Sequence, residues 1–351
     1  MSDTTGDAIF YVAYKQNFFQ PFSLLSLRSK HRCMKLFLKR TAYALLFIFI
    51  FFNIICAVQA YHFTRFVDNS ERPNFNEMGF FEKTGATLFG VPVPKSIVVD
   101  SLNIPHTTVK IETEDGLHLA AWSTLGKKDS MAKKGTIIMF HGHGSCRSGL
   151  IKEATSFYNL GWNIIDVDFR NHGESEGTTC SVGYNESKDV KAVYDYAAKI
   201  GEKNIVLFGA SMGAATITKA MHDYPNMQPA KLILEMPFAS MCEASEGFVR
   251  VMNLPSEPLG VFLTLWGGIN LGGIWAFSNK PVEYAKDINC ATLLQWGAKD
   301  FRVKESETRS IYNNLNAKEK QLVIYENSGH ESLCKKENEK WMQNVAAFLN
   351  K

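Results

Sequence analysis

Short apolar runs alternate with stretches of helical periodicity from about residue 135 to the end of the chain. Each run has five or six residues, as expected for a buried strand. Strands that alternate with helices predict a mostly parallel, doubly wound α/β sheet with helices on both faces. The runs are residues 136–140, 204–208, 231–235, 291–296 and 321–325.

Two more runs, residues 108–112 and 117–122, flank Glu114-Asp115-Gly116 and predict an antiparallel hairpin at the edge of this sheet. The predicted domain covers residues 105–351, which is long enough for one complete hydrophobic core.

The predicted sheet carries an insertion at residues 237–286, between two of its strands. This segment has no charged residue from Pro258 to Asn279. We expect it to form a helical cap. The cap either lines a lipophilic pocket and touches a membrane, or simply packs on the sheet, and the sequence leaves both alternatives open.

A separate apolar segment lies near the N-terminus. No charged side chain occurs from Thr41 to Thr64, and about 20 apolar residues cross a bilayer as a helix. Residues 1–40 carry seven basic and two acidic side chains, and the positive-inside rule then places the N-terminus in the cytoplasm and the rest of the chain on the other side. We predict a basic segment 1–40, a single transmembrane anchor 41–63 and a juxtamembrane linker 64–104.

A cleaved signal sequence is the alternative, which would make the protein secreted. Val58-Gln59-Ala60 offers a small-residue cleavage site, and Met34 offers a later start with a short basic leader. The apolar run is longer than an ordinary leader core, so the sequence favours an uncleaved anchor.

The composition of the chain excludes some classes of function but does not indicate one. The net charge is +3, and since residues 1–40 contribute an excess of basic groups, the charge reflects topology and does not predict nucleic-acid binding. The seven cysteines form no C-x-x-C pair and no zinc-like spacing with histidine. We therefore expect no metal and no cofactor, and we expect unpaired thiols, with Cys180, Cys242, Cys290 and Cys334 the pool from which an exported domain would oxidise a pair.

The most informative motif is Gly209-Ala210-Ser211-Met212-Gly213. It follows the apolar run 204–208 and precedes a helical segment, residues 214–222. A G-x-S-x-G at a strand-to-helix turn holds its serine on a strained backbone where a base can reach the hydroxyl. The sequence therefore predicts that Ser211 is a catalytic nucleophile.

An acid and a histidine follow in the order that such a serine requires. Asp300 comes just after the run 291–296, and His330 comes shortly after the run 321–325. Carboxyl ends of parallel strands meet at one edge of a sheet, so we expect His330 to act as general base and Asp300 to orient its imidazole.

These pieces together resemble the serine hydrolases of the α/β-hydrolase superfamily, in particular the branch of serine aminopeptidase-like and monoacylglycerol-lipase-like enzymes. The resemblance covers about residues 105–351 and implies the α/β-hydrolase fold. Asn171 departs from the glycine that many relatives carry, which affects a loop. The matching segments are residues 140–144, 166–175, 209–213, 297–300 and 329–330.

The same resemblance implies an oxyanion hole made of two backbone N–H groups. One belongs to Met212, directly after the nucleophile. The other comes from the loop after the run 136–140, where we expect His143 to supply it.

Three functions fit the sequence. The first is a membrane-anchored esterase that cleaves lipophilic acyl esters through an acyl-enzyme, with a lipid-like substrate. The second is a serine aminopeptidase-like enzyme, for which Glu243 and Glu246 of the cap would recognise a free amino terminus. The third is a non-catalytic, membrane-tethered binding module. The intact Ser211, Asp300 and His330 argue against the third.

Overall fold

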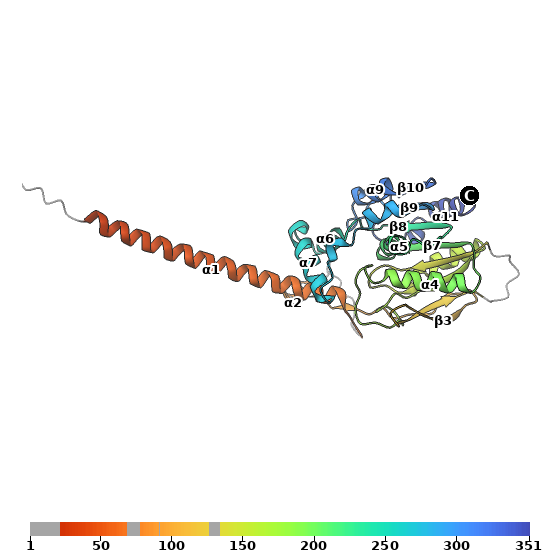
Figure 1. The fold of residues 1–351 in the computed structure, drawn as a ribbon, viewed down its shortest axis with the longest axis horizontal. Coiled ribbons are helices and arrows are strands. Elements are labelled where there is room, and N and C mark those ends of the chain that lie inside the picture. The colour runs from red at the N-terminus through yellow and green to blue at the C-terminus, as the bar shows by residue number, and fades with distance from the viewer. Residues whose placement is uncertain (1–21, 69–77, 91, 126–133) are drawn as a thin grey trace, which may run out of the picture. The chain divides into compact units, whose positions relative to one another are not determined.

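The structure, a computed structural model, describes residues 22–68, 78–90, 92–125 and 134–351, with side chains from residue 30 onward. The chain divides into two compact units, Met1–Phe52 and Asn53–Lys351. Helix α1 (Phe22–Thr64) begins in the first unit, and its last twelve residues belong to the second. Figure 1 shows the elements along the chain.

An eight-stranded sheet forms the centre of the second unit, in the order β10-β9-β8-β7-β5-β6-β4-β3. β3 and β4 form an antiparallel hairpin, β4 also runs antiparallel to β6, and every other pairing is parallel. The alternating pattern predicts this mostly parallel sheet, and the strand order is the one that the resemblance to α/β-hydrolases implies. The strands are β3 (Thr107–Glu112), β4 (His118–Ser123), β5 (Thr136–Phe140), β6 (Asn163–Val167), β7 (Ile205–Ala210), β8 (Lys231–Glu235), β9 (Ala291–Gly297) and β10 (Lys320–Tyr325).

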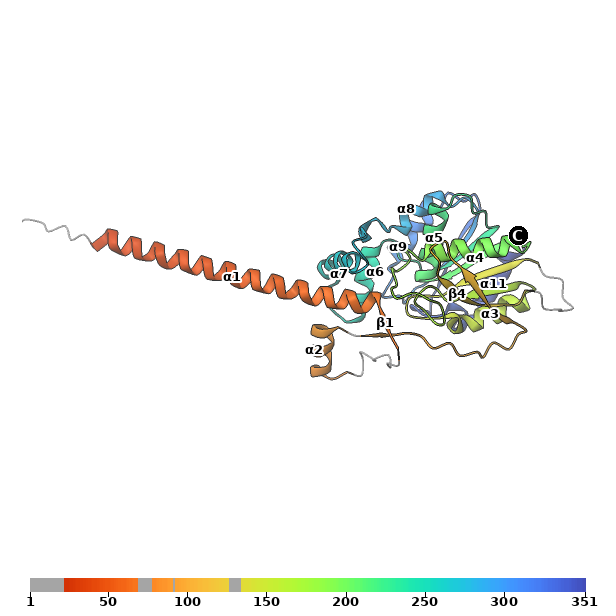
Figure 2. The same cartoon turned by 60° about the horizontal axis from the view of Figure 1, so that its bottom comes forward.

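Helices cover both faces of this sheet (Figure 2). α4 and α5 pack against each other, and α3 meets α11 through the rings of Phe157 and Trp341, whose centroids are 5.3 Å apart. Central strands such as β5 are buried on both faces, which explains why they are continuous apolar runs rather than alternating ones. The helices are α3 (Ile151–Asn159), α4 (Ser187–Lys199), α5 (Met212–Asp223), α9 (Glu305–Asn314), α10 (Leu333–Lys336) and α11 (Asn338–Leu349), with a 3₁₀ turn η1 (Arg147–Leu150).

The insertion between β8 and β9 is helical. Its two longer helices, α6 (Met241–Val251) and α7 (Ser256–Asn270), pack on each other. Ser240 caps α6 by accepting a hydrogen bond from the N–H of Glu243 at 3.2 Å. Three short elements complete the segment: η2 (Ala276–Ser278), α8 (Pro281–Tyr284) and η3 (Ala285–Asp287).

The segment expected to be a linker contains regular structure. It holds helix α2 (Phe80–Phe89) and two short strands, β1 (Phe66–Val67) and β2 (Val93–Pro94), which pair in parallel. The residues after β2 then contact the hydrolase domain, because Ser96 Oγ donates to the carbonyl oxygen of Gly144 at 2.5 Å. Proline-containing sequence with few apolar repeats carries little local signal for such pairing, which depends on distant partners.

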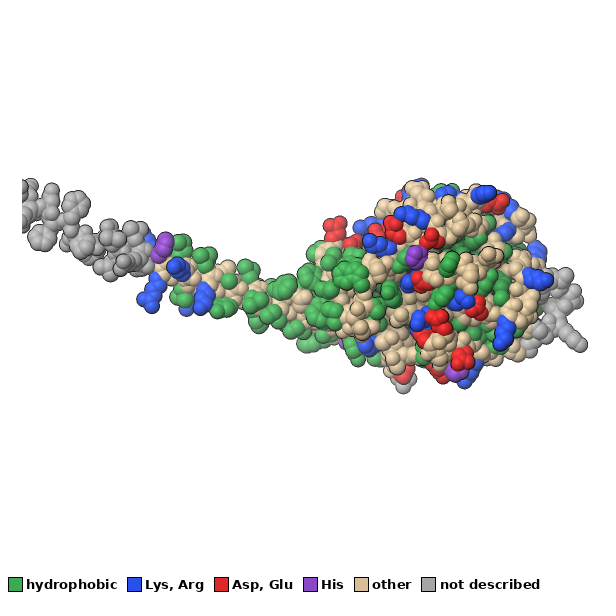
Figure 3. All heavy atoms as spheres, viewed as in Figure 1, with side chains coloured by type: hydrophobic (Ala, Val, Ile, Leu, Met, Phe, Trp, Pro, Cys, Tyr) green, Lys and Arg blue, Asp and Glu red, His purple; other side chains and the backbone are tan. Residues whose placement is uncertain are grey.

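Helix α1 is longer than the predicted anchor. Among the described residues, one helical stretch, Lys30–Thr64, is long and apolar enough to cross a membrane, and an 18-residue window within it has a mean hydropathy of 2.4. Figure 3 shows hydrophobic side chains along this helix and basic ones near its start. The helix continues through Lys35 and Arg40, because neither residue type breaks a helix.

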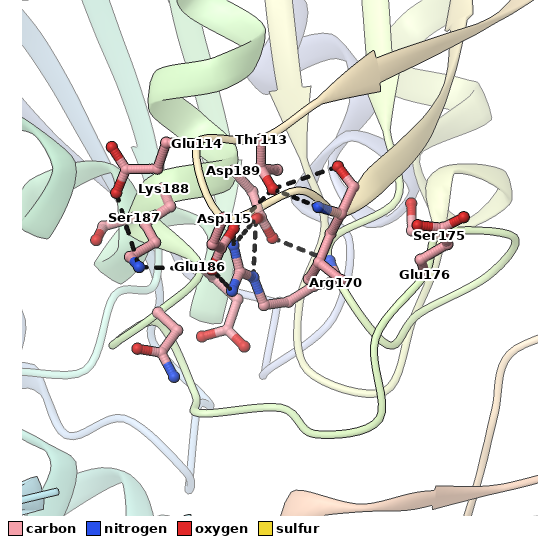
Figure 4. A network of polar contacts seen from close by, with 12 residues as sticks. Thr113, Glu114, Asp115, Arg170, Ser175, Glu176, Glu186, Ser187, Lys188 and Asp189 are labelled. Carbon is pink, nitrogen blue, oxygen red and sulfur yellow. Dashed lines mark hydrogen bonds and ion pairs between the residues drawn. The ribbon is translucent and has the colours of Figure 1, made fainter.

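A buried ionic network holds the hairpin β3–β4 against the loop after β6 (Figure 4). The guanidinium of Arg170 contacts Asp115 at 2.8 Å and Asp189 at 2.6 Å. Asp189 lies in the first turn of α4 and is fully buried. The same loop contains Asn171, whose φ of 61° is the left-handed conformation that asparagine tolerates better than most residues. This explains why asparagine can replace the glycine that is common in similar sequences.

Candidate active site

Ser211 occupies a strained turn between β7 and α5. Its φ is 53° and its ψ is −113°, a conformation that is costly for a residue with a side chain. A side chain at either flanking glycine would clash with the backbone. A Cβ on Gly213 would lie 2.2 Å from the carbonyl oxygen of Phe140, and one on Gly209 would lie 2.6 Å from the nitrogen of Ala214. The turn therefore presents the Ser211 hydroxyl beyond the end of the sheet.

A continuous chain of hydrogen bonds joins this hydroxyl to a histidine and an acid. Ser211 Oγ lies 2.9 Å from Nε2 of His330, and Nδ1 of His330 lies 2.7 Å from Oδ2 of Asp300. The three residues are 119 and 30 positions apart in sequence. The geometry brings together the three side chains that the sequence selects.

Asp300 is held in place by its own backbone neighbours. Its side chain is completely buried, and Oδ1 accepts hydrogen bonds from the N–H groups of Arg302 at 2.8 Å and Val303 at 2.9 Å. Oδ2 is thereby directed at His330. The loops that carry the two residues also touch directly, since the N–H of Lys299 donates to the carbonyl oxygen of Ser328 at 2.9 Å.

The loop after β5 lies against the serine. A Cβ built on Gly142 would be 3.4 Å from Cβ and 4.0 Å from Oγ of Ser211, so the backbone at Gly142, directly before His143, passes next to the hydroxyl. Met212 is the first residue of α5, and the N–H of a first helical residue has no acceptor within its own helix. Of the two residues predicted for the oxyanion hole, Met212 directly follows Ser211, and His143 directly follows Gly142.

Two buried histidines support this loop without joining the Ser-His-Asp chain. Nε2 of His172 accepts from the N–H of Gly144 at 3.1 Å, and its Nδ1 lies 2.9 Å from the carbonyl oxygen of Arg170. Burial holds the pKa of His172 well below its usual range, so the ring is neutral and can accept. His141 has the same arrangement, with Nε2 accepting from the N–H of Phe169 at 3.1 Å.

Two family profiles match the chain in succession. The profile of the serine aminopeptidase S33 family matches residues 131–265, and that of the prolyl oligopeptidase family matches residues 263–351. Protein YqkD of Bacillus subtilis is 28% identical over 222 residues, which cover 61% of this chain and 71% of YqkD. The lysophosphatidylserine lipase ABHD12 of Mus musculus is 25% identical over 231 residues, 58% of this chain, and the match spans 54% of that lipase.

Solved structures show the same fold. An esterase of Pyrococcus furiosus superposes with a TM-score of 0.60 at 23% identity, covering 74% of this chain and 98% of the esterase. A bacterial membrane phospholipase A superposes with a TM-score of 0.51 at 20% identity, covering 70% of this chain and 86% of the phospholipase. The chain belongs to the α/β-hydrolase superfamily.

In this α/β-hydrolase, the side chain of His143 has a role that the sequence did not indicate. Nε2 of His143 lies 2.9 Å from the carbonyl oxygen of Phe63, at the end of α1. One residue later, the carbonyl oxygen of Thr64 accepts from the N–H of Cys180 at 2.8 Å. Cys180 Sγ in turn contacts Met212 Sδ at 3.6 Å. Phe63 and Thr64 could not be identified as contacts of this loop from the sequence, because their pattern is that of the last residues of a transmembrane segment.

An apolar pocket lies between the end of α1 and the cap of this α/β-hydrolase. Its walls are almost entirely apolar atoms, with a hollow of about 420 Å³ that includes its open mouth. Among the described residues, no group of three or more His, Cys, Asp or Glu side chains could hold a metal ion. The pocket is lined chiefly by Phe63, Phe248, Leu263, Gly267, Leu271 and Ala276.

Proposed function

We propose that this protein is a membrane-anchored serine hydrolase that cleaves carboxylic esters with lipophilic acyl groups. The observation that carries the proposal is the hydrogen-bonded series from Ser211 Oγ through His330 to Asp300. A serine hydroxyl is a weak nucleophile unless a base takes its proton, and His330 Nε2 lies at hydrogen-bonding distance to do so.

In the proposed reaction, Ser211 Oγ attacks the ester carbonyl while His330 accepts its proton. His330 then returns that proton to the leaving alcohol, and an acyl-serine remains. Water attacks the acyl-serine with His330 as base again, which releases the acid and restores the hydroxyl. Asp300 keeps the proton of the neutral imidazole on Nδ1 and stabilises the imidazolium form. The N–H groups of His143 and Met212 stabilise the oxyanion, at about 3 kcal/mol for each donor.

Lipophilic esters are favoured over peptides by the cap. The similar mouse protein is a lysophosphatidylserine lipase, and the pocket beside the cap is apolar. A subsite for a free amino terminus needs an unpaired acid. Of the two acids considered for it, Glu243 and Glu246, the second already faces Arg250 at 3.4 Å and Lys304 at 3.8 Å.

An uncleaved anchor is favoured over a signal sequence by the burial at the candidate cleavage site. Gln59 and Ala60 are 5% and 3% exposed. The Gln59 amide donates to the carbonyl oxygens of Ala86 at 2.7 Å and Thr87 at 2.8 Å, within α2. Cleavage after Ala60 would remove these contacts from the domain. We infer a single-pass protein with a cytoplasmic N-terminus and the hydrolase domain on the opposite side.

The test compares p-nitrophenyl esters of graded acyl length with aminoacyl anilides, using the full-length protein. We expect ester hydrolysis that rises with acyl length and is abolished in Ser211→Ala, while Ser310→Ala, an exposed serine on α9, keeps wild-type rates. Faster cleavage of the anilides would favour the peptidase. If the wild-type protein neither reacts with a fluorophosphonate nor cleaves any ester, the esterase proposal is wrong and the non-catalytic binding module is favoured.

A further inference from the structure

The last three turns of α1 are part of the hydrolase domain. Cys56, Ala60 and Thr64 lie on one face of the helix, and each is at most 3% exposed. On the opposite face, Ile54 and Tyr61 are about half exposed. One side of the helix end therefore packs on the domain while the other side remains open.

Helix α7 of the cap runs beside these turns. Nε1 of Trp266 donates to Oδ1 of Asn53 at 3.1 Å, and Nδ2 of Asn270 donates to the carbonyl oxygen of Ala57 at 3.0 Å. Arg65, directly after α1, donates to the carbonyl oxygen of Asn270 at 2.8 Å. Hydrogen bonds therefore join α7 to α1 at two positions along the helix, about one turn apart.

Because of these contacts, α7 has the same depth as the end of α1 in the proposed membrane-spanning arrangement. Asn53 lies about 20 Å along the helix from Arg40, the last charged residue before the apolar run. The hydrocarbon core is about 30 Å thick, so residues 53–60 lie in the half of the bilayer nearer the hydrolase domain, and residues 61–64 reach its surface. Trp266 and Asn270 must lie at the same depth as their partners.

The surface of α7 suits that environment. Val261, Leu265 and Ile269, spaced four residues apart on its outer face, are 37–49% exposed, and Trp275 is 65% exposed. Figure 3 shows hydrophobic side chains gathered where α7 lies. A helix that is apolar on all sides and still exposed is typical of contact with lipid.

The inner face of α7 forms one wall of the apolar pocket. Leu263, Gly267 and Leu271 follow one another at four-residue intervals along that face, and the end of α1 forms the facing wall with Phe63. Phe63 stacks on His143, with ring centroids 4.2 Å apart. Phe63 therefore has the pocket on one side and His143, in the loop after β5, on the other.

We propose that this pocket binds the hydrocarbon chain of a membrane-resident, single-chain ester, and that it opens within the half of the bilayer nearer the hydrolase domain. The substrate then enters laterally from the lipid, with its ester group directed at Ser211. This inference rests on the proposed esterase function for its substrate, but the pocket can be tested without catalysis.

Gly267 gives the sharpest test. A Cβ at this position meets no atom within 4 Å, so Gly267→Leu fills the pocket without a backbone clash. Gly85→Leu is the matched control, because Gly85 lies in α2, away from the pocket lining, and its Cβ also meets no atom within 4 Å.

The experiment uses full-length protein in phosphatidylcholine vesicles that contain palmitic acid with a diazirine near its methyl end. Irradiation should attach the probe to peptides that contain residues 59–64 or 263–271. We expect at least tenfold less attachment in Gly267→Leu and wild-type attachment in Gly85→Leu. For hydrolysis, the ratio of kcat/KM for the palmitate ester to that for the butyrate ester should fall at least tenfold in Gly267→Leu alone.

Equal attachment in Gly267→Leu and the wild type would overturn the acyl site. Attachment to these peptides from aqueous probe but never from vesicles would overturn the bilayer opening. Ser211 labelling by a fluorophosphonate, measured in parallel, separates the two proposals: a protein that labels and cleaves esters but does not attach the probe keeps the esterase function and loses the acyl site.

Discussion

The imidazole of His143 lies flat on the ring of Phe63, with the ring planes 18° apart and Nε2 at 2.9 Å from the Phe63 carbonyl oxygen. That distance lets the His143 N–H donate to the last turn of α1. Since His143 directly follows Gly142, which lies beside Ser211, the end of the apolar helix contacts the proposed oxyanion loop.

Replacing His143 by alanine should therefore lower kcat although the backbone N–H remains. We expect a loss of about tenfold, or about 1.4 kcal/mol, that is equal for short and long acyl chains, because the loop loses its ring contact rather than its pocket. The measurement is kcat across p-nitrophenyl esters, with the melting temperature as a check on folding.

His118→Ala is the matched control for His143→Ala, because His118 is a half-exposed histidine bonded to Glu176 at 3.1 Å. A normal kcat in His143→Ala would show that the stacked ring does not position the loop.

Asp300→Asn should keep the fold and lose most of the activity. The amide oxygen can still accept from the N–H groups of Arg302 and Val303, which the present Oδ1 does. The amide N–H₂ facing His330, however, favours the wrong tautomer. We expect kcat/KM to fall by about 10³- to 10⁴-fold.

Asp287→Asn provides the comparison for Asp300→Asn, since Asp287 is an exposed aspartate that also contacts a histidine, His222, at 2.6 Å. A loss below tenfold in Asp300→Asn would remove Asp300 from the proposed reaction.

The proposed catalytic residues could be selected from sequence because each follows a strand. Ser211, Asp300 and His330 come shortly after β7, β9 and β10, and parallel strands bring their carboxyl ends to one edge. The local sequence was therefore sufficient to predict where these three residues lie and which chemical role to propose for each.

The contacts of α1 could not be predicted in the same way. A uniformly apolar helix gives no periodicity that distinguishes lipid-facing from protein-facing positions. The bond from Gln59 to α2 joins residues 27 positions apart, and the one from Asn270 to Ala57 joins residues 213 apart. Such pairings depend on tertiary packing, which short sequence windows do not record.

Removing the Arg170 guanidinium should destabilise the domain strongly. Arg170 stabilises the charged form of Asp189, while burial raises the pKa of that carboxyl to about 7. Without the cation, the carboxyl is left buried and uncompensated, which typically costs about 3–5 kcal/mol. We expect Arg170→Ala to lower the urea midpoint accordingly, measured by tryptophan fluorescence in detergent.

The control for Arg170→Ala is Lys188→Ala. Lys188 is one-third exposed and lies 3.4 Å from Asp115, so its ion pair should contribute less than about 1 kcal/mol. Equal effects of the two substitutions would contradict the importance of burial.

Glu235 should make the stability of the domain fall as pH rises. Its side chain is 1% exposed, and Oε1 accepts from Nε1 of Trp341 at 2.6 Å and Nε2 of Gln295 at 3.1 Å. Burial, with a smaller contribution from the Glu153 carboxylate, raises its pKa from 4.5 to about 8. Between these two pH values the folded protein keeps a proton on Glu235 that the unfolded chain releases. The contribution of Glu235 to the free energy of unfolding is therefore greatest below pH 4.5 and decreases up to about pH 8.

Glu235→Gln mimics the protonated acid and should remove this dependence. At pH 5 we expect the variant and the wild type to melt within about 2 °C of each other, and at pH 8.5 we expect the variant to melt several degrees higher, because one unit of pKa corresponds to about 1.4 kcal/mol. Glu339→Gln, an exposed position on α11, should shift neither value. The prediction would be contradicted by a Glu235→Gln protein that is less stable than the wild type at pH 8.5. In that case the buried carboxylate is ionised and stabilises the fold, because the surrounding donors require its charge.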